Sequence, residues 1–149
     1  MLDVILIPEH EKETVFDLAI ALDREQPMQT AFGLSTPPIV VPTTKGPPHV
    51  GASGWLFHLD DPNLLLTRLV PGRRESSGDS AEPADAVTAR LLECGGASGL
   101  AEFRCVRDPK RAVVLDAQGG FLLEAGCSGD AVSLEVTPNE LVQVQVEFS

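Results

Sequence analysis

Residues 141–148 have the sequence LVQVQVEF, in which apolar and polar side chains alternate without a break. Side chains along a β-strand point alternately to its two faces, so this segment predicts a strand with one apolar and one polar face. The apolar face consists of Val142, Val144, Val146 and Phe148. Residues 131–136 (AVSLEV) alternate in the same way, and residues 137–140 supply the proline and asparagine of a tight turn. The C-terminus therefore predicts an antiparallel strand pair that covers a hydrophobic core.

Further strand-like segments precede this pair, each bounded by turn-forming residues. They cover residues 55–59, 63–70, 86–93, 100–106, 111–115 and 121–124. Glycine, proline and aspartate occupy the intervals, as in Asp60-Asp61-Pro62. Residues 64–66 are apolar on both faces, which predicts a central place in the sheet for their strand. With the N-terminal candidates the total reaches about nine strands, and we expect an all-β fold, an antiparallel β-sandwich.

The N-terminal part of the chain, residues 1–54, is less regular. We expect short strands at residues 2–7 and 39–41, which are apolar, β-branched and ended by proline. Residues 15–22 fit both a strand and an amphipathic helix, and their cleaner alternation favours a strand. Residues 29–34 have room for a turn of helix or a bend. The whole chain of 149 residues is the size of one domain.

Two segments are predicted to be loops. Residues 45–54 are rich in glycine and proline, whereas residues 71–85 are polar and contain glycine and serine. We expect residues 71–85 to form a solvated, mobile loop that joins two strands and does not divide the chain into domains.

The composition argues against several classes of partner. The formal net charge is -11, from 11 Lys and Arg against 22 Asp and Glu, which would repel a nucleic-acid backbone. No apolar run reaches the roughly 20 residues that span a membrane, and no signal peptide is recognisable. Cys94, Cys105 and Cys127 are odd in number and lack a C-x-x-C spacing. They predict three reduced, mostly buried thiols in a cytoplasmic protein, with one disulfide and a spare thiol as the alternative.

No motif for catalysis, cofactor binding or metal binding is found. The three histidines have no H-x-x-x-H or H-E-x-x-H spacing, and Cys94, which adjoins a glycine turn, has no basic neighbour that would lower its pKa. Asp60 and Asp61 have the composition of a turn rather than of a catalytic carboxylate pair. We therefore predict no catalytic residue, cofactor or metal ligand.

The candidate ligand-facing residues are Trp55, His58 and His49. Trp55 and His58 follow the Gly/Pro loop that contains His49, and their rings could stack on a sugar. A core position for Trp55 is the favoured interpretation, because it is the single tryptophan and opens an apolar strand. Aromatic residues make up only 5% of the chain and tyrosine is absent, which argues against an autonomous sugar-binding module.

The order of these features from residue 55 to residue 148 resembles the C-terminal β-sandwich region of glycoside hydrolase family 38, the α-mannosidases. The matching segments are residues 64–72 (LLLTRLVPG), 86–93 (AVTARLLE), 111–120 (RAVVLDAQGG) and 132–146 (VSLEVTPNELVQVQV). Residues 14–22, Pro27 and the segment 36–38 are similar to the preceding part of such domains.

The resemblance implies a function without catalysis. Family 38 enzymes carry their zinc ligands and nucleophilic aspartate in an N-terminal catalytic domain, so no catalytic residue is carried over to this sequence. What it implies is an accessory domain that packs on a glycosidase catalytic domain, with residues 45–54 as the candidate loop for contributing to the substrate cleft. The alternative is an autonomous carbohydrate-binding or protein-interaction module.

Overall fold

The computed structural model describes residues 12, 15, 18–36, 38–40, 42, 54–72 and 85–148. The chain forms two compact units, Met1–Pro37 and Pro38–Ser149, and each is treated separately below. The predicted strand at residues 2–7 and the loop segment 45–53, with His49, lie outside the described residues. The same holds for residues 73–84 of the predicted mobile loop.

The first unit contains a helix, α1 (Pro27–Ser35), where at most one helical turn is predicted. A proline in the first turn suits a helix start because its φ is already helical and its missing N–H is not needed there. None of the side chains of α1 is buried. The prediction of a strand at residues 15–22 is wrong for the part that is described, since residues 18–22 form no strand. Alternation of side chains alone does not determine that a segment pairs as a strand.

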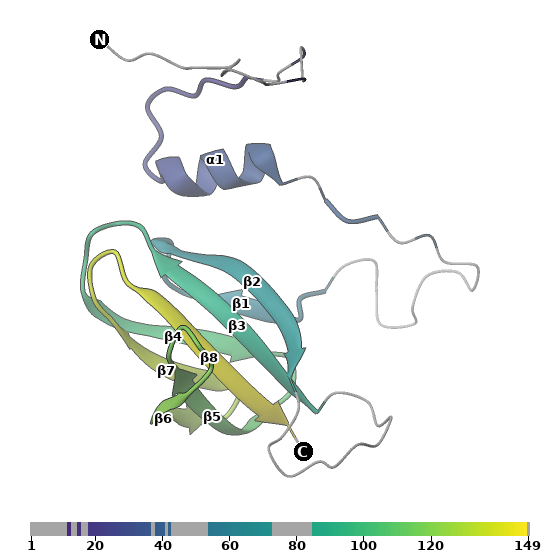
Figure 1. Cartoon of the computed structure of the whole chain (residues 1–149), viewed down its shortest axis with the longest axis vertical. Coiled ribbons are helices and arrows are strands. Elements are labelled where there is room, and N and C mark those ends of the chain that lie inside the picture. The colour runs from purple at the N-terminus through teal and green to yellow at the C-terminus, as the bar shows by residue number, and fades with distance from the viewer. Residues whose placement is uncertain are drawn as a thin grey trace. The chain divides into compact units, whose positions relative to one another are not determined.

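The second unit is an antiparallel β-sheet, which confirms the predicted all-β fold (Figure 1). Residues 54–72 and 85–148 contain eight strands: β1 (Phe57–Leu59), β2 (Leu64–Gly72), β3 (Ala86–Glu93), β4 (Gly99–Cys105), β5 (Pro109–Leu115), β6 (Phe121–Ser128), β7 (Ala131–Val136) and β8 (Leu141–Phe148). Their order across the sheet is β1-β4-β7-β6-β5-β8-β3-β2.

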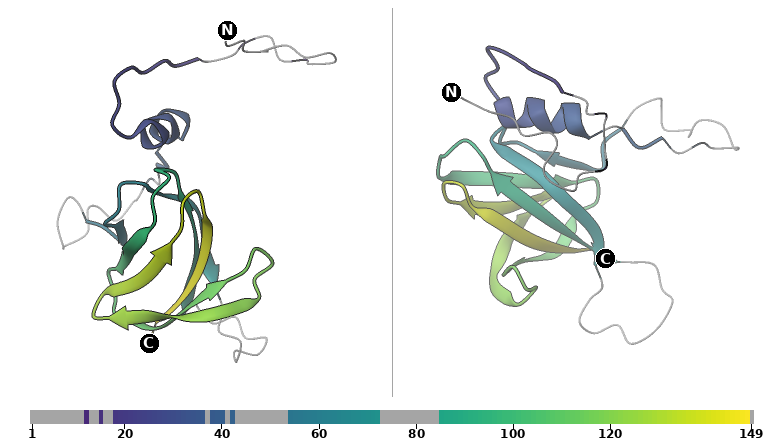
Figure 2. Two further views of the ribbon diagram at one scale, coloured as in Figure 1. Left: turned by 90° about the vertical axis from the view of Figure 1, so that its left-hand side faces the viewer. Right: turned by 45° about the horizontal axis from the view of Figure 1, so that its top comes forward.

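Strand β6 turns the two predicted sheets of a sandwich into one. Its first part pairs with β5 through Ala125, and its last residues, from Gly126 to Ser128, pair with β7. The sheet therefore folds over on itself and is nearly closed, which makes it barrel-like, as the left view of Figure 2 shows. The apolar pattern predicts an end of this strand at Glu124, because the small and polar residues that follow do not continue it.

The core lies between the folded-over halves of this sheet. The predicted apolar face of β8 is buried, with Val144 and Val146 fully enclosed. Its counterpart on β7 is also in the core: Val132, Leu134 and Val136. Phe103 of β4 is fully buried, and its ring stacks on that of Phe57 with the centroids 5.4 Å apart. The second unit is therefore stabilised by a continuous apolar core, as the alternation predicts.

Two further predictions of strand position are wrong. Strand β2 lies at an edge of the sheet and not at its centre. Leu64 and Leu65 are buried, but the register shifts after Leu66 and the strand is exposed from Thr67 to Leu69. The apolar run therefore predicts burial correctly only for the first residues of β2, next to the preceding turn. Residues 38–40 form no strand, and both Ile39 and Val40 are exposed.

Candidate functional site: an apolar groove between β6 and β7

Of the three residues predicted to face a ligand, Trp55 and His58 are among the described residues, whereas His49 is not. Trp55 is 50% exposed, so its predicted core position is wrong. The tryptophan precedes β1, and it is Phe57 and Leu59 that pack against the core. His58 is exposed in the middle of β1, opposite Arg104 of β4. Neither Trp55 nor His58 lines the groove described next.

A groove of about 550 Å³ lies where the sheet opens. Its floor is formed by core-facing side chains of β5, β7 and β8: Val114, Leu134 and Val142. Its walls carry three exposed leucines, Leu100 of β4 (68% exposed) with Leu122 and Leu123 of β6 (57% and 54%). The groove is therefore a direct opening onto the hydrophobic core.

The groove exists because β6 and β7 diverge. The two strands are paired from Ser128↔Ala131 to Gly126↔Ser133, and no register pairs continue beyond that point. Residues 122–125 of β6 and residues 134–135 of β7 then line opposite sides of the opening. Val136, the last residue of β7, is not in the lining. Each of these segments is paired on its other side, with β5 and with β4.

A register shift in the β5–β6 pair explains the unusual exposure on β6. Leu115 pairs with Phe121 and Val114 pairs with Leu123, so Leu122 is an extra residue on the β6 side. Such a bulge interrupts the alternation of side chains between faces. Three consecutive apolar residues, Phe121 to Leu123, are each more than half exposed as a result.

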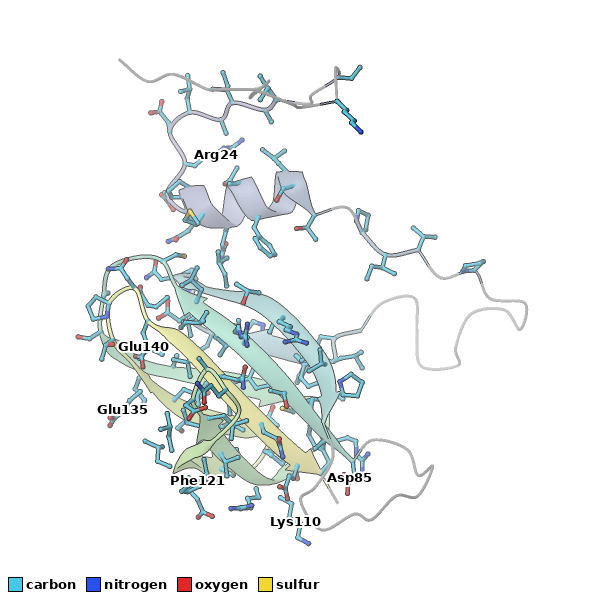
Figure 3. All side chains as sticks on the ribbon, in the orientation of Figure 1. Arg24, Asp85, Lys110, Phe121, Glu135 and Glu140 are labelled. Carbon is cyan, nitrogen blue, oxygen red and sulfur yellow. The ribbon has the colours of Figure 1, made fainter. Side chains whose placement is uncertain are left out.

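Carboxylates surround this apolar opening. Glu124, Glu135 and Glu140 contribute to its lining, and no lysine or arginine does so. Glu124 pairs with Arg111 at 3.1 Å, and Glu140 accepts hydrogen bonds from the N–H and hydroxyl of Thr137 at 2.7 and 2.8 Å. Figure 3 shows Glu135 and Glu140 along one side of the sheet. The groove thus combines an apolar floor with an acidic rim.

A second notable carboxylate, that of Glu93, is structural. Its side chain is 1% exposed and accepts four backbone hydrogen bonds, from Gly95, Gly96, Ala97 and Asn139, at 2.8 to 3.3 Å. The N–H of Asn139 is the main influence that lowers the pKa of Glu93, and burial opposes it. Because all of these donors stabilise the ionised form, Glu93 is a poor proton acceptor. Glu93 is not among the residues predicted from the sequence, although a glutamate at the end of a strand and just before a glycine-rich turn is a usable signal.

The cysteines do not provide a nucleophile. All three are free thiols, but only Cys105 is buried, which corrects the prediction that most of them are. Burial raises the pKa of Cys105 to about 11, and burial also raises the pKa of Cys94 and of the exposed Cys127. The thiol of Cys94 donates to the carbonyl oxygen of Asn63 at 2.9 Å. These thiols are therefore mostly protonated at neutral pH, and none of them is activated as a nucleophile.

Asp60 and Asp61 form a turn, as predicted. Asp61 accepts a hydrogen bond from the N–H of Asn63 at 2.8 Å, and Asp60 accepts one from the N–H of Glu102 at 2.7 Å. Both carboxylates are thus engaged with the backbone and do not face each other across a site. Among the described residues, no three His, Cys, Asp or Glu side chains are grouped so that they could hold a metal ion.

No protein-family model, curated protein or solved structure matches this chain. The resemblance to the family 38 C-terminal region therefore stays a prediction. The described part of the chain contains no helix that is long and apolar enough to cross a lipid bilayer.

Proposed function

We propose that this chain is a non-catalytic accessory domain that docks on a partner protein through the groove between β6 and β7. The carrying observation is that Leu100, Leu122 and Leu123 are more than half exposed around an opening onto the core. Contiguous exposed apolar surface commonly marks a site of protein association. A small-molecule active site requires polar groups that converge on the ligand. The floor of this groove is apolar and does not offer such groups.

The partner proposed is a glycosidase catalytic domain of the α-mannosidase type, in the same chain or in a separate one. The resemblance to family 38 supports this choice, since its matching segments include β3 and the β7–β8 pair that borders the groove. Three free thiols support a cytoplasmic location, because disulfides are rare in that compartment. Neither proposal depends on an activity of the chain itself.

Binding to a family 38 catalytic domain expressed without its C-terminal sandwich tests the proposal. We expect a complex by isothermal titration calorimetry that the double variant Leu122→Ser/Leu123→Ser no longer forms. Val106→Ser is the matched control, because Val106 is 57% exposed but lies outside the groove lining. Equal binding by the double variant would reject the groove as the docking site. Absence of binding by the wild-type chain would reject this partner.

A carbohydrate-binding function is the second candidate, and the exposure of Trp55 favours it. Trp55 and its neighbour Leu56 are 50% and 67% exposed beside the edge strand β1. Binding on a glycan array that is lost in a folded Trp55→Ala variant would favour this function over docking.

A further inference from the structure

We infer that the groove accepts an extended peptide segment with alternating apolar and basic residues, which adds as a strand to β6, β7 or both. This inference rests on the proposed docking function and specifies the chemistry of the partner. Three independent features of the groove carry it: its backbone edges, its apolar floor and its acidic rim.

The backbone edges favour an extended ligand. Beyond Gly126↔Ser133, β6 and β7 are each paired on one side only. In a strand, alternate residues direct their N–H and C=O groups to one side, so each divergent segment presents unpaired hydrogen-bonding groups to the opening. Residues 122–125 and 134–136 are long enough to pair with a strand of about three or four residues. A peptide in this position would close the sheet between β6 and β7.

The floor and the rim define which side chains such a strand would carry. Its inward-facing residues would meet Val114, Leu134 and Val142, so they must be apolar. Its other residues would lie near Glu124, Glu135 and Glu140, with no cation in the groove lining. Among the described residues Glu135 forms no ion pair, and the formal net charge of the chain is -11. Lysine or arginine at alternate positions is therefore the complementary choice.

The probe is a synthetic peptide of six residues in which lysine and valine alternate. Its matched control has glutamate in place of each lysine. We expect the lysine peptide to bind the full chain in calorimetry and the glutamate peptide not to bind. Methylation of two alternate backbone nitrogens should weaken binding about tenfold or more, because the peptide loses donors to the strand edge. Leu122→Ser/Leu123→Ser should weaken it, and Val106→Ser should not.

Charge reversal tests the rim. Glu135→Lys should lower the affinity for the lysine peptide about fivefold, because an exposed attraction becomes a repulsion. The same variant should raise the affinity for the glutamate peptide. Glu135 is exposed, so this variant should fold normally. Equal affinity of the methylated and unmethylated peptides would overturn strand addition.

Two other outcomes separate this inference from the docking proposal. A chain that binds the catalytic domain through Leu122 and Leu123 but binds no alternating peptide would overturn the inference and keep the proposed function. A concentration-dependent dimer in analytical ultracentrifugation, abolished by Leu122→Ser/Leu123→Ser and unaffected by the lysine peptide, would assign the groove to a second copy of this chain. That result would also overturn it.

Discussion

The carboxylate of Glu93 accepts a hydrogen bond at 2.8 Å from the backbone N–H of Asn139, 46 residues later in the chain. Glu93 ends β3, and Asn139 lies in the turn between β7 and β8 with a φ of 61°. The same carboxylate holds the turn that follows β3 through Gly95, Gly96 and Ala97. One buried side chain therefore links the two turns at this end of the β3–β8 pair, beside the backbone hydrogen bond from the N–H of Glu93 to the carbonyl oxygen of Glu140.

The first prediction is that Glu93→Gln destabilises the fold. The amide of glutamine would present its own N–H groups to two of the four backbone donors, which would leave those donors unsatisfied in a buried place. We expect a clear fall in the denaturant midpoint at pH 7. Glu135→Gln is the matched control, because Glu135 is exposed and should leave the midpoint unchanged.

The effect of Glu93 should also depend on pH. Its pKa in the folded chain is lowered below the ordinary value of 4.5, so its contribution to stability is fully present above pH 4.5. That contribution is lost as the pH falls through the lower, folded-state pKa. We expect the difference in unfolding free energy between wild type and Glu93→Gln to shrink below pH 4.5. A difference that stays constant on acidification would show that Glu93 does not act as a carboxylate.

The second prediction concerns Gly95, which has a packing reason to be glycine. A Cβ atom at this position would lie 2.4 Å from Cγ and 2.9 Å from Cβ of Asn63. The carbonyl oxygen of Asn63 accepts the N–H and the thiol of Cys94, so Asn63 has little freedom to move. Gly95→Ala should cost about 1–3 kcal/mol of unfolding free energy, as overpacking usually does.

Gly99→Ala is the control for this substitution. A Cβ atom at Gly99 meets no atom within 4 Å, and its backbone is not in the left-handed region. We expect its unfolding free energy to stay within about 0.5 kcal/mol of wild type. Equal destabilisation by both alanines in urea denaturation would contradict the packing explanation.

The third prediction uses two phenylalanines in opposite environments. Phe103 is fully buried and stacks on Phe57, whereas Phe121 is 59% exposed at the start of β6. Phe103→Ala should lower the unfolding free energy by about 3–5 kcal/mol, the usual cost of removing a buried phenyl ring. Phe121→Ala should change it by no more than about 0.5 kcal/mol. A large loss from Phe121→Ala would mean that the exposed surface of β6 is needed for folding and is not reserved for a partner.

The local pattern of the sequence predicts the strands that have one buried face. The bounds of β3, β7 and β8 agree with the prediction; β8 alternates over its full length, and β3 and β7 alternate over most of theirs, against a continuous core. The alternation of apolar and polar residues does not predict the structure where the pairing of strands decides it. Residues 18–22 belong to a segment predicted as a strand but form none, and the apolar start of β2 does not reveal that this strand is at an edge.

The candidate site was less predictable than the fold, because it arises from contacts between distant segments. The groove depends on the point at which β6 and β7 cease to pair, and neither strand encodes that register by itself. One local signal was present: Phe121, Leu122 and Leu123 are consecutive apolar residues beside a glycine turn, which an ordinary half-buried strand would not show. The acidic rim combines residues from β6, β7 and the turn before β8.

The last prediction is an order of reactivity among the three thiols. Cys127 is exposed, Cys94 is half-buried with its thiol bonded to Asn63, and Cys105 is buried with a pKa of about 11. Thiolates react and thiols do not, so the pKa of about 11 disfavours Cys105, and greater access favours Cys127. With an aromatic disulfide reagent at pH 8, we expect one fast reaction at Cys127, a slower one at Cys94 and none at Cys105 until the chain is unfolded.

The pH dependence and one variant test this order. Because burial raises the pKa of Cys127 above its ordinary value of 9.0, its labelling rate should still be rising at pH 9. Cys127→Ser should remove the fast phase and leave the slower one unchanged, as peptide mass spectrometry of the labelled chain would show. Rapid labelling of Cys105 in the native state would contradict its place in the core between β1 and β7, and with it the strand order of this half of the sheet.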